Sequence, residues 1–504
     1  MSPTAFKAMS APRAPGEREE NETEKGLRVA DKGFLNTAVM RSTITYIDGE
    51  AGVLRYRGYP IEQLALHSSH LETAYLLMYG SLPTAPQLAE FQSEVMHHGT
   101  VHADAEQFCR SFRYDAHPMA ILTSAFAYLG SYYSEANPSL QGQNIYTRGD
   151  KASLELMDKQ IYRLIGKATT LAAHVLSIMF NGDYLTYSLP TAWPTASAKA
   201  VNSSRPQQIS AIPARAFFSP LLSPRLSSAL YRFLYQMDHL GEENYVPNPV
   251  LEKALDVLFL LHADHELNAS STTVLQTGSS LVDPYSAIAG PLHGGANEAV
   301  IRMLISIGKP ENVPAFLDAV KKREKVLSGF GHRVYKTSDP RSFIVRKTAD
   351  EVFKITGKDE LLETAMALHE AAMKDEYFIK RRLAPNISLI PICTISGLIY
   401  RAMGESEPDT FQRKLTCGAG FPLDFFPVLF AVPRVVGWLA HWRQVGCVKG
   451  QFAAEKSEGK RDYVPVEQRV AVVGPKVTPS KVLHSGITKR TNLASFKGKV
   501  SAKL

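Results

Sequence analysis

Apolar side chains recur at helical spacing over long stretches of this 504-residue chain, and no other feature constrains the fold as much. One continuous face is formed by Ile161, Leu164, Ile165, Ala168, Leu171, Ala172, Val175, Leu176 and Met179. A second is formed by Leu251, Ala254, Leu255, Leu258 and Phe259. Residues three and four positions apart share one side of a helix, so both stretches are predicted to be amphipathic helices. Proline and glycine clusters between such stretches indicate an all-α bundle with short connections, divided into two domains.

Strand-forming residues are concentrated near the N-terminus. Thr43–Ile47 and Val53–Tyr56 are rich in β-branched and aromatic residues, and they flank Asp48-Gly49. An Asp-Gly pair between two such runs is typical of a β-hairpin. We therefore predict one small N-terminal hairpin ahead of the helical body.

Two apolar stretches, Ile387–Tyr400 and Phe425–Ala440, are short or are interrupted by Arg434. This length and this charge favour buried helices over membrane spans. The four cysteines are widely spaced and form no C-x-x-C pair, which argues against a disulfide framework and a zinc ribbon. The composition therefore favours a protein of a reducing compartment that does not enter the membrane.

The net charge of +7 belongs to the C-terminal tail. Residues 470–504 carry seven basic and no acidic side chains, and removing these seven from the 56 basic residues leaves 49 against 49 acidic ones. A neutral body with a basic tail that lacks interleaved aromatic residues favours a solvated extension over a nucleic-acid-binding arm. We expect no nucleic-acid partner.

The chain ends in Ala502-Lys503-Leu504, a conservative variant of the Ser-Lys-Leu peroxisomal address. Five glutamates between Glu17 and Glu24 depart from the acidic-poor composition of a mitochondrial transit peptide. We predict import into the peroxisome by its receptor, with the mitochondrial matrix as the alternative. Residues 188–225, with six prolines and seven serines and no helical periodicity, are predicted to be a loop or disordered insertion.

The most informative motif for function is the run of thirteen residues from Gly329 to Arg341, Gly-Phe-Gly-His-Arg-Val-Tyr-Lys-Thr-Ser-Asp-Pro-Arg. Gly329 and the glycine at 331 allow a tight bend before His332, which presents an imidazole at a turn. Lys336 and Arg341 then supply two cations. A lone histidine in a loop is more often a surface residue, but this combination predicts a site for an anion that carries a carbonyl group.

This run resembles the active-site motif of the citrate synthase family, and four further segments resemble the family in the same order. They are Ser42–Gly49 with Leu54–Ile61, Leu261–Asn268, Gly290–Asn297 and Val436–Trp442. The resemblance covers residues 33 to 469 and is to the peroxisomal or glyoxysomal, bacterial-like type. It implies a helical homodimer whose large and small domains close over acetyl-CoA and oxaloacetate, with no cofactor and no metal.

By the same resemblance, residues 1–32 are a flexible segment ahead of the enzyme. The large domain covers 33–293 and 387–469, the small domain covers 294–386, and 470–504 is the basic tail.

The resemblance also assigns roles to six residues. Arg341, Arg434 and His265 match contacts to oxaloacetate, whose two carboxylates suit guanidinium groups. His332 matches the donor to the oxaloacetate carbonyl, and His293 matches the donor to the enol or enolate oxygen of the thioester. Lys336 matches a cation for the CoA phosphates. The alternatives from the residues alone are a structural salt bridge for Arg434, a capped or core histidine for His265 and a surface lysine for Lys336.

The chain departs from the family where the catalytic base is expected. The family carries an aspartate in an Asn-Val-Asp-Phe-Tyr-Ser-Gly type of segment, whereas Pro385–Gly397 contains no acidic residue. We expect the inserted Leu389–Ile395 to move the helix start at Ser396-Gly397 out of register.

Three further departures accompany it. They are an inserted block at Glu405–Gly420, a shortened segment at Ser286–Gly290, and the lack of an Arg-Pro segment between Trp442 and Arg461.

Several functions remain open from the sequence. The first hypothesis is citrate synthase, and 2-methylcitrate synthase would use the same histidines with propionyl-CoA. An inactive paralogue or the product of mis-joined exons would lack the aspartate in this way. His262, His265 and Glu266 raise a zinc hydrolase as a further candidate, although their spacing is not His-Glu-x-x-His.

Overall fold

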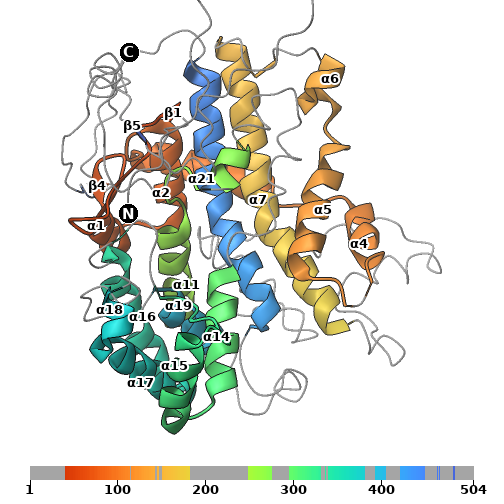
Figure 1. Cartoon of the computed structure of the whole chain (residues 1–504). Helices are drawn as coiled ribbons and strands as arrows, with labels where there is room; N and C mark the ends of the chain where they lie inside the picture. The colour runs from red at the N-terminus through yellow and green to blue at the C-terminus, as the bar shows by residue number, and fades with distance from the viewer. Residues whose placement is uncertain are drawn as a thin grey trace, which may run out of the picture.

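The structure is a computed structural model that describes the central enzyme-like part of the chain (Figure 1). The described residues are 40–113, 115–141, 145–146, 150–181, 248–268, 270–274, 295–330, 335, 339–380, 392–403, 421–448, 463, 465 and 481–482. The predicted N-terminal segment 1–32 and the 188–225 insertion lie outside these residues, as do all but two residues of the tail.

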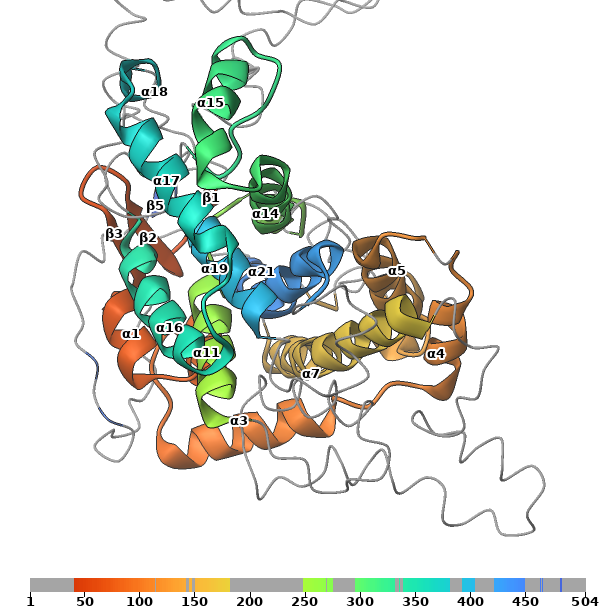
Figure 2. The ribbon, with the colours of Figure 1, turned by 90° about the horizontal axis from the view of Figure 1, so that it is seen from below.

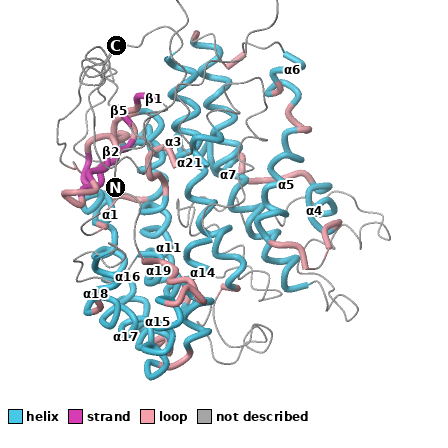
Figure 3. The backbone as a smooth tube through the Cα atoms, viewed as in Figure 1, coloured by secondary structure: helices cyan, strands magenta, loops and turns pink. Residues whose placement is uncertain are grey.

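Helices dominate the described residues, as the periodicity predicts (Figure 3). The longer helices are α1 (Ile61–His67), α2 (His70–Tyr79), α3 (Ala85–His97), α4 (Ala103–Arg110), α5 (Pro118–Gly130), α7 (Lys151–Asn181), α11 (Pro249–His262), α14 (Gly295–Ile307), α15 (Val313–Lys321), α16 (Pro340–Thr356), α17 (Leu361–Lys374), α19 (Ile392–Ala402) and α21 (Phe426–Val448). The short helices are α6 (Pro138–Gln141) and α18 (Glu376–Lys380). The strands are β1 (Met40–Arg41), β2 (Thr45–Asp48), β3 (Val53–Tyr56), β4 (Tyr59–Pro60) and β5 (Lys481–Val482).

The predicted hairpin is present as β2 and β3, which pair antiparallel with Thr45 opposite Tyr56 and Asp48 opposite Val53. The short strand β4 pairs with β3 and makes a sheet of three strands. Successive residues of a strand point to opposite faces, so Thr45 and Tyr56 share the buried face. This face turns both polar side chains towards the end of α11.

The helices α7, α11 and α21 carry the core. The two predicted apolar faces lie on α7 and α11. On α7 the predicted residues from Ile161 to Leu176 are buried, and on α11 all five predicted residues are buried. Helix α21 packs against α7, α2 and α11, and Figure 1 shows it alongside α7 through the middle of the molecule. Both faces therefore form as the spacing predicts.

The described part of the first apolar stretch, from Ile392, and the second apolar stretch form buried helices, as predicted. Leu423–Gln444 is long and apolar enough to span a membrane by composition, but 83% of its apolar window is covered by the rest of the protein. Helix α19 is likewise mostly buried. Core helices of this kind pass composition tests for membrane spans, so burial decides the assignment.

Helices α14 to α18 gather at one end of the molecule, next to α19 (Figure 2). Helix α16 packs against α19, α11 and α1, while α14 packs against α19 and α21. These contacts bring the start of α16 to the end of α11. The predicted small domain 294–386 contains this group, but both of its predicted boundaries fall within or next to undescribed residues, so the division stays a prediction.

Residues after α21 return to the N-terminal elements. The amide of Tyr463 donates to Gln63 Oε1 at 2.8 Å, and the Tyr463 ring stacks on His67 with centroids 5.2 Å apart. In the tail, β5 pairs antiparallel with β1. The tail was predicted to extend into solvent, and this pairing shows that two of its residues are instead held by the backbone of Met40–Arg41.

Candidate active site

The candidate site is built around the turn that follows α11. The helix ends at His262, and the chain then runs through Ala263, Asp264, His265 and Glu266, all of which are buried. Glu266 has a φ of 56°, a left-handed conformation that a residue with a side chain adopts at some energetic cost. Its Oε1 accepts a hydrogen bond from the amide of Ile47, which ties the turn to strand β2 at 3.2 Å.

Arg341 reaches this turn from the start of α16. Asp339 caps the helix by accepting a hydrogen bond from the Arg341 amide at 3.0 Å, and Pro340 occupies the first helical position. The same carboxylate holds the guanidinium, through Nε at 2.9 Å and Nη2 at 2.7 Å. Burial by itself lowers the pKa of Arg341, but Asp339 outweighs it and raises the pKa above its ordinary value. Arg341 is therefore a fixed cation with 4% of its surface exposed.

Arg434 reaches the turn from α21 and is just as buried, with 2% exposure. Its Nε donates to the His262 carbonyl oxygen at 2.5 Å, and its guanidinium carbon lies 4.4 Å from the centre of the Phe430 ring. Burial lowers the pKa of Arg434 to about 10, and the nearby Asp264 opposes this shift. The guanidinium stays charged near neutral pH.

Two arginines from different helices thus meet at the last carbonyl groups of α11. Arg341 Nη1 lies 3.4 Å from the Leu261 carbonyl oxygen, next to the His262 carbonyl that Arg434 contacts. The C-terminus of a helix carries partial negative charge, which favours cations at this point. Two buried guanidinium groups at one point are the kind of donor set that a ligand with two carboxylates requires.

Four aromatic or imidazole rings lie in the same region. His265 packs edge-on against Tyr335 with ring centroids 5.7 Å apart. His262 Nδ1 lies 3.3 Å from the Tyr400 hydroxyl. Burial, with the two arginines, lowers the pKa of His262 well below its ordinary value, so this ring is neutral at physiological pH. Burial likewise raises the pKa of Tyr335 well above its ordinary value, so its hydroxyl keeps its proton.

The structure brings together three of the six predicted site residues: His265, Arg341 and Arg434. The other three, His293, His332 and Lys336, lie outside the described residues. The bend predicted before His332 is present at Gly329, whose φ is 82°. Helix α14 begins at Gly295, immediately after the predicted His293 turn.

Cys393 lies beside the Gly329 bend. A Cβ added to Gly329 would come within 3.2 Å of Cys393 Sγ. Helix α19 begins at Ile392, so our prediction of a helix start at Ser396-Gly397 was wrong; that pair lies inside the helix. Asn297 Nδ2 donates to Ser396 Oγ at 3.0 Å and fixes α19 on α14. Counting back from this pair along the family's segment places the aspartate position at Cys393.

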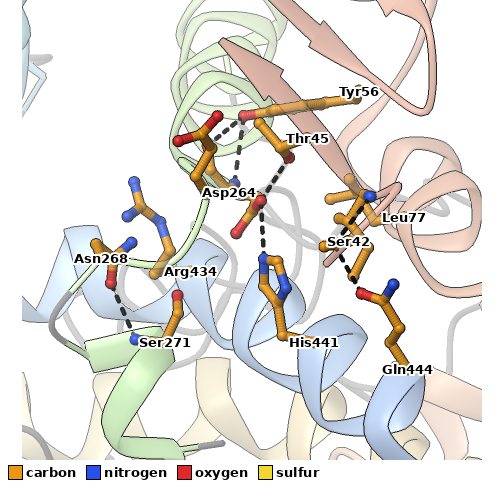
Figure 4. A network of polar contacts seen from close by, with 12 residues as sticks. Ser42, Thr45, Tyr56, Leu77, Asp264, Asn268, Ser271, Arg434, His441 and Gln444 are labelled. Carbon is orange, nitrogen blue, oxygen red and sulfur yellow. Dashed lines mark hydrogen bonds and ion pairs between the residues drawn. The ribbon is translucent and has the colours of Figure 1, made fainter. Parts of the chain in front are cut away.

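Four residues in this region were not predicted from the sequence: Asp339, Asp264, His441 and Cys393. Asp-Pro before a helix is a recognisable capping signal, so Asp339 could have been found. Asp264 and His441 are 177 residues apart and meet only in the fold, where His441 Nε2 lies 3.2 Å from Asp264 Oδ2 (Figure 4). No local pattern predicts such a pair.

The zinc hydrolase reading gains no support from the geometry. The imidazole of His262 faces Tyr400, and Glu266 Oε1 accepts the Ile47 amide. Within the ranges that the structure describes, no group of three histidine, cysteine or acidic residues is placed to hold a metal ion.

Comparison with known proteins agrees with this geometry. Residues 33–446 match the sequence profile of the citrate synthase C-terminal domain. The glyoxysomal citrate synthase of Cucurbita maxima is 44% identical over 460 residues, which cover 89% of this chain and 77% of that protein. The peroxisomal citrate synthase of Dictyostelium discoideum is 42% identical over 477 residues, which cover 92% of this chain and 84% of that protein.

A solved structure agrees as well. The citrate synthase of the archaeon Thermoplasma acidophilum, determined as a ternary complex with carboxymethyl coenzyme A and oxaloacetate, superposes with a TM-score of 0.63 at 25% sequence identity. The match covers 87% of this chain and 99% of that one. With a family profile over most of its length and relatives above 40% identity, the chain belongs to the citrate synthase family.

Proposed function

We propose that the chain binds oxaloacetate and acetyl-CoA and carries the site for their condensation to citrate. The observation that supports this most is the meeting of Arg341 and Arg434 at the end of α11. Oxaloacetate has two carboxylates, and two buried guanidinium groups offer the paired donors that hold them. His265 lies in the same turn and completes the proposed dianion site.

The remaining roles follow the family. A base removes a proton from the acetyl methyl group, and His293 donates to the enol or enolate oxygen. The methyl carbon then bonds to the oxaloacetate carbonyl carbon, while His332 protonates the new alkoxide. Water cleaves the thioester and releases CoA, whose phosphates Lys336 contacts. The reaction draws on side-chain acids and bases, and it uses no cofactor.

A second candidate function is substrate binding without efficient condensation. It is favoured by the absence of an acidic residue from Pro385–Gly397, where the base belongs. Cys393 does not replace it, because burial raises the pKa of its thiol to about 11 and keeps the thiol protonated at neutral pH. A neutral thiol is a poor base for a weakly acidic methyl group.

CoA release and oxaloacetate binding by the full-length chain separate the two candidates. We expect saturable binding of oxaloacetate, with CoA release slower by about 10²–10⁴ than in a family member that has the aspartate. Release at that member's rate would show that another acid supplies the base. A chain that shows no oxaloacetate binding and no CoA release would overturn the proposal. Faster turnover of propionyl-CoA than of acetyl-CoA would identify a 2-methylcitrate synthase.

We further propose that the protein is a homodimer that the peroxisomal receptor imports through Ala502-Lys503-Leu504. Glyoxysomal and peroxisomal relatives support this location, in which the enzyme would serve the glyoxylate cycle. The mitochondrial matrix is the alternative.

A further inference from the structure

One face of α21 holds the turn after α11 through three contacts in register. Positions i, i+3 and i+7 of a helix lie on the same side, so a single face of α21 meets the last residue of α11 and the first two residues of the turn. The contacts are Arg434 Nε to the His262 carbonyl at 2.5 Å, the Gly437 amide to the Ala263 carbonyl at 3.1 Å, and His441 Nε2 to Asp264 Oδ2 at 3.2 Å.

The last of these contacts is completely buried. Asp264 and His441 are both 0% exposed. Asp264 Oδ2 also accepts a hydrogen bond from Thr45 Oγ1 at 2.5 Å, and the Tyr56 hydroxyl donates to the Asp264 carbonyl oxygen at 2.7 Å (Figure 4). Asp264 Oδ1 and His441 Nδ1 have no hydrogen-bond partner among the described residues. Asp264 therefore joins β2 and α21 through its carboxylate and β3 through its backbone carbonyl.

The approach of α21 leaves no room for adjustment. A Cβ on Gly437 would collide with the Ala263 carbonyl oxygen and with Asp264 Oδ1. Packed interiors resist such displacement, so the turn and this face of α21 move together or not at all. Arg434 lies one helical turn before Gly437, and His265 directly follows Asp264.

The contact between Asp264 and His441 also includes a charged group. Burial by itself raises the pKa of Asp264, but the His441 ring, the Thr45 hydroxyl and Arg434 outweigh burial and lower it below its ordinary value. The carboxylate is therefore ionised and is a counter-charge for Arg434. A buried carboxylate with a hydrogen-bonded imidazole is rigid, because loss of either partner leaves a desolvated polar group.

We propose that Asp264 and His441 are positioning residues of the dianion site, which hold Arg434 and His265 in one geometry without touching the ligand. The inference rests on the proposed function, since it takes oxaloacetate as the ligand. It predicts that removal of the His441 donor weakens oxaloacetate binding while the folded state persists.

The test is calorimetric titration of oxaloacetate into the full-length chain and its variants. We expect His441→Leu to raise the dissociation constant about tenfold, the lower end of the effect that loss of a supporting hydrogen bond has at metal sites. His441→Gln keeps a side-chain N–H donor and should stay within about threefold of the parent. Thr45→Val removes the second donor to Asp264 with little change of shape, and it should weaken binding even where His441→Leu does not fold.

The matched control is His70→Leu in α2. His70 is also 0% exposed but lies outside the site, so its replacement should leave the dissociation constant unchanged. Unchanged binding in folded His441→Leu or Thr45→Val overturns the inference alone, as does equal weakening in His441→Gln and His441→Leu. Absence of oxaloacetate binding by the parent overturns both this inference and the proposed function.

Discussion

Cys393 is the residue at which this chain differs most consequentially from its family. It lies beside the Gly329 bend, at the position to which the family's aspartate corresponds when counted back from Ser396-Gly397. Its pKa of about 11 leaves the thiol protonated at neutral pH. A carboxylate at this point would lie close to the predicted His332 turn, where proton abstraction requires a base.

We predict that Cys393→Asp raises the rate of CoA release from acetyl-CoA and oxaloacetate by at least about tenfold. Cys393→Ser is the control, because it changes the group without adding a base. Thermal unfolding of each variant reports whether the new buried carboxylate disrupts the fold. A folded Cys393→Asp protein with the parent's rate would show that the base position lies elsewhere.

Lys167 on α7 is a buried amine outside the site. It is 3% exposed, and its Nζ donates to the His98 carbonyl oxygen at 2.7 Å. Burial, followed by repulsion from Arg163, lowers the pKa of Lys167 from 10.5 to about 8. Below pH 8 the amine is charged in both the folded and the unfolded chain. Between pH 8 and 10.5 the unfolded chain binds more protons, so this lysine makes stability rise with pH.

We therefore predict that Lys167→Met increases stability near pH 7 and removes this rise. The measurement is the free energy of unfolding in urea for both proteins from pH 7 to pH 10. Because the other ionisable groups are shared, the difference between the two curves isolates Lys167. Parallel curves for the parent and the variant would show that titration of Lys167 does not cause this rise.

At the scale of the element, local pattern was sufficient for α7, α11 and the hairpin. Each shows its period within its own residues, and each buries the predicted face. The pattern also identified α21 as a core helix, because the buried Arg434 interrupts an otherwise apolar stretch. Local pattern could not predict the left-handed Glu266, whose conformation depends on strand β2, or the meeting of Asp264 with His441. These features exist only after distant segments have packed.

The close contact between α21 and the turn after α11 predicts a stability effect at Gly437. Gly437→Ala should destabilise the protein by about 1–3 kcal/mol, because the added methyl group collides with the Ala263 carbonyl oxygen and the Asp264 carboxylate. Gly295→Ala is the matched control, since a Cβ there meets nothing within 4 Å. The measurement is the midpoint of denaturant unfolding for each variant. Equal midpoints would mean that α21 can shift to accommodate the methyl group.

At the scale of the whole molecule, the family and the all-α fold could be predicted because several motifs occur in one order. Of the six predicted site residues, His265, Arg341 and Arg434 lie together at the end of α11, whereas His293, His332 and Lys336 lie in undescribed segments. The chain departs from the family in four blocks, each flanked by sequence that resembles the family. These blocks are 188–225, 286–290, 385–397 and 405–420. Sequencing the transcript across codons 380–430 would show whether an Asn-Val-Asp type of segment is encoded there.

The C-terminal tail indicates a location in the cell, and this can be tested independently of the candidate site. A reporter ending in residues 470–504 should enter peroxisomes, and deletion of Ala502-Lys503-Leu504 should leave it in the cytosol. Fluorescence microscopy of the two reporters is the measurement. Import of the full-length chain into mitochondria, with no peroxisomal signal, would favour the matrix alternative.

The meeting of Arg341 and Arg434 at one helix end is the central claim, and titration of oxaloacetate into two matched arginine variants tests it most directly. Arg341 donates to Asp339 through Nε and Nη2, and Arg443 donates to Asp158 through the same two atoms, away from the site. Lysine keeps the charge and loses the paired donors. We predict that Arg341→Lys weakens oxaloacetate binding about 100-fold while Arg443→Lys leaves it within about threefold. Equal affinity in the two variants would contradict the assignment of the dianion site.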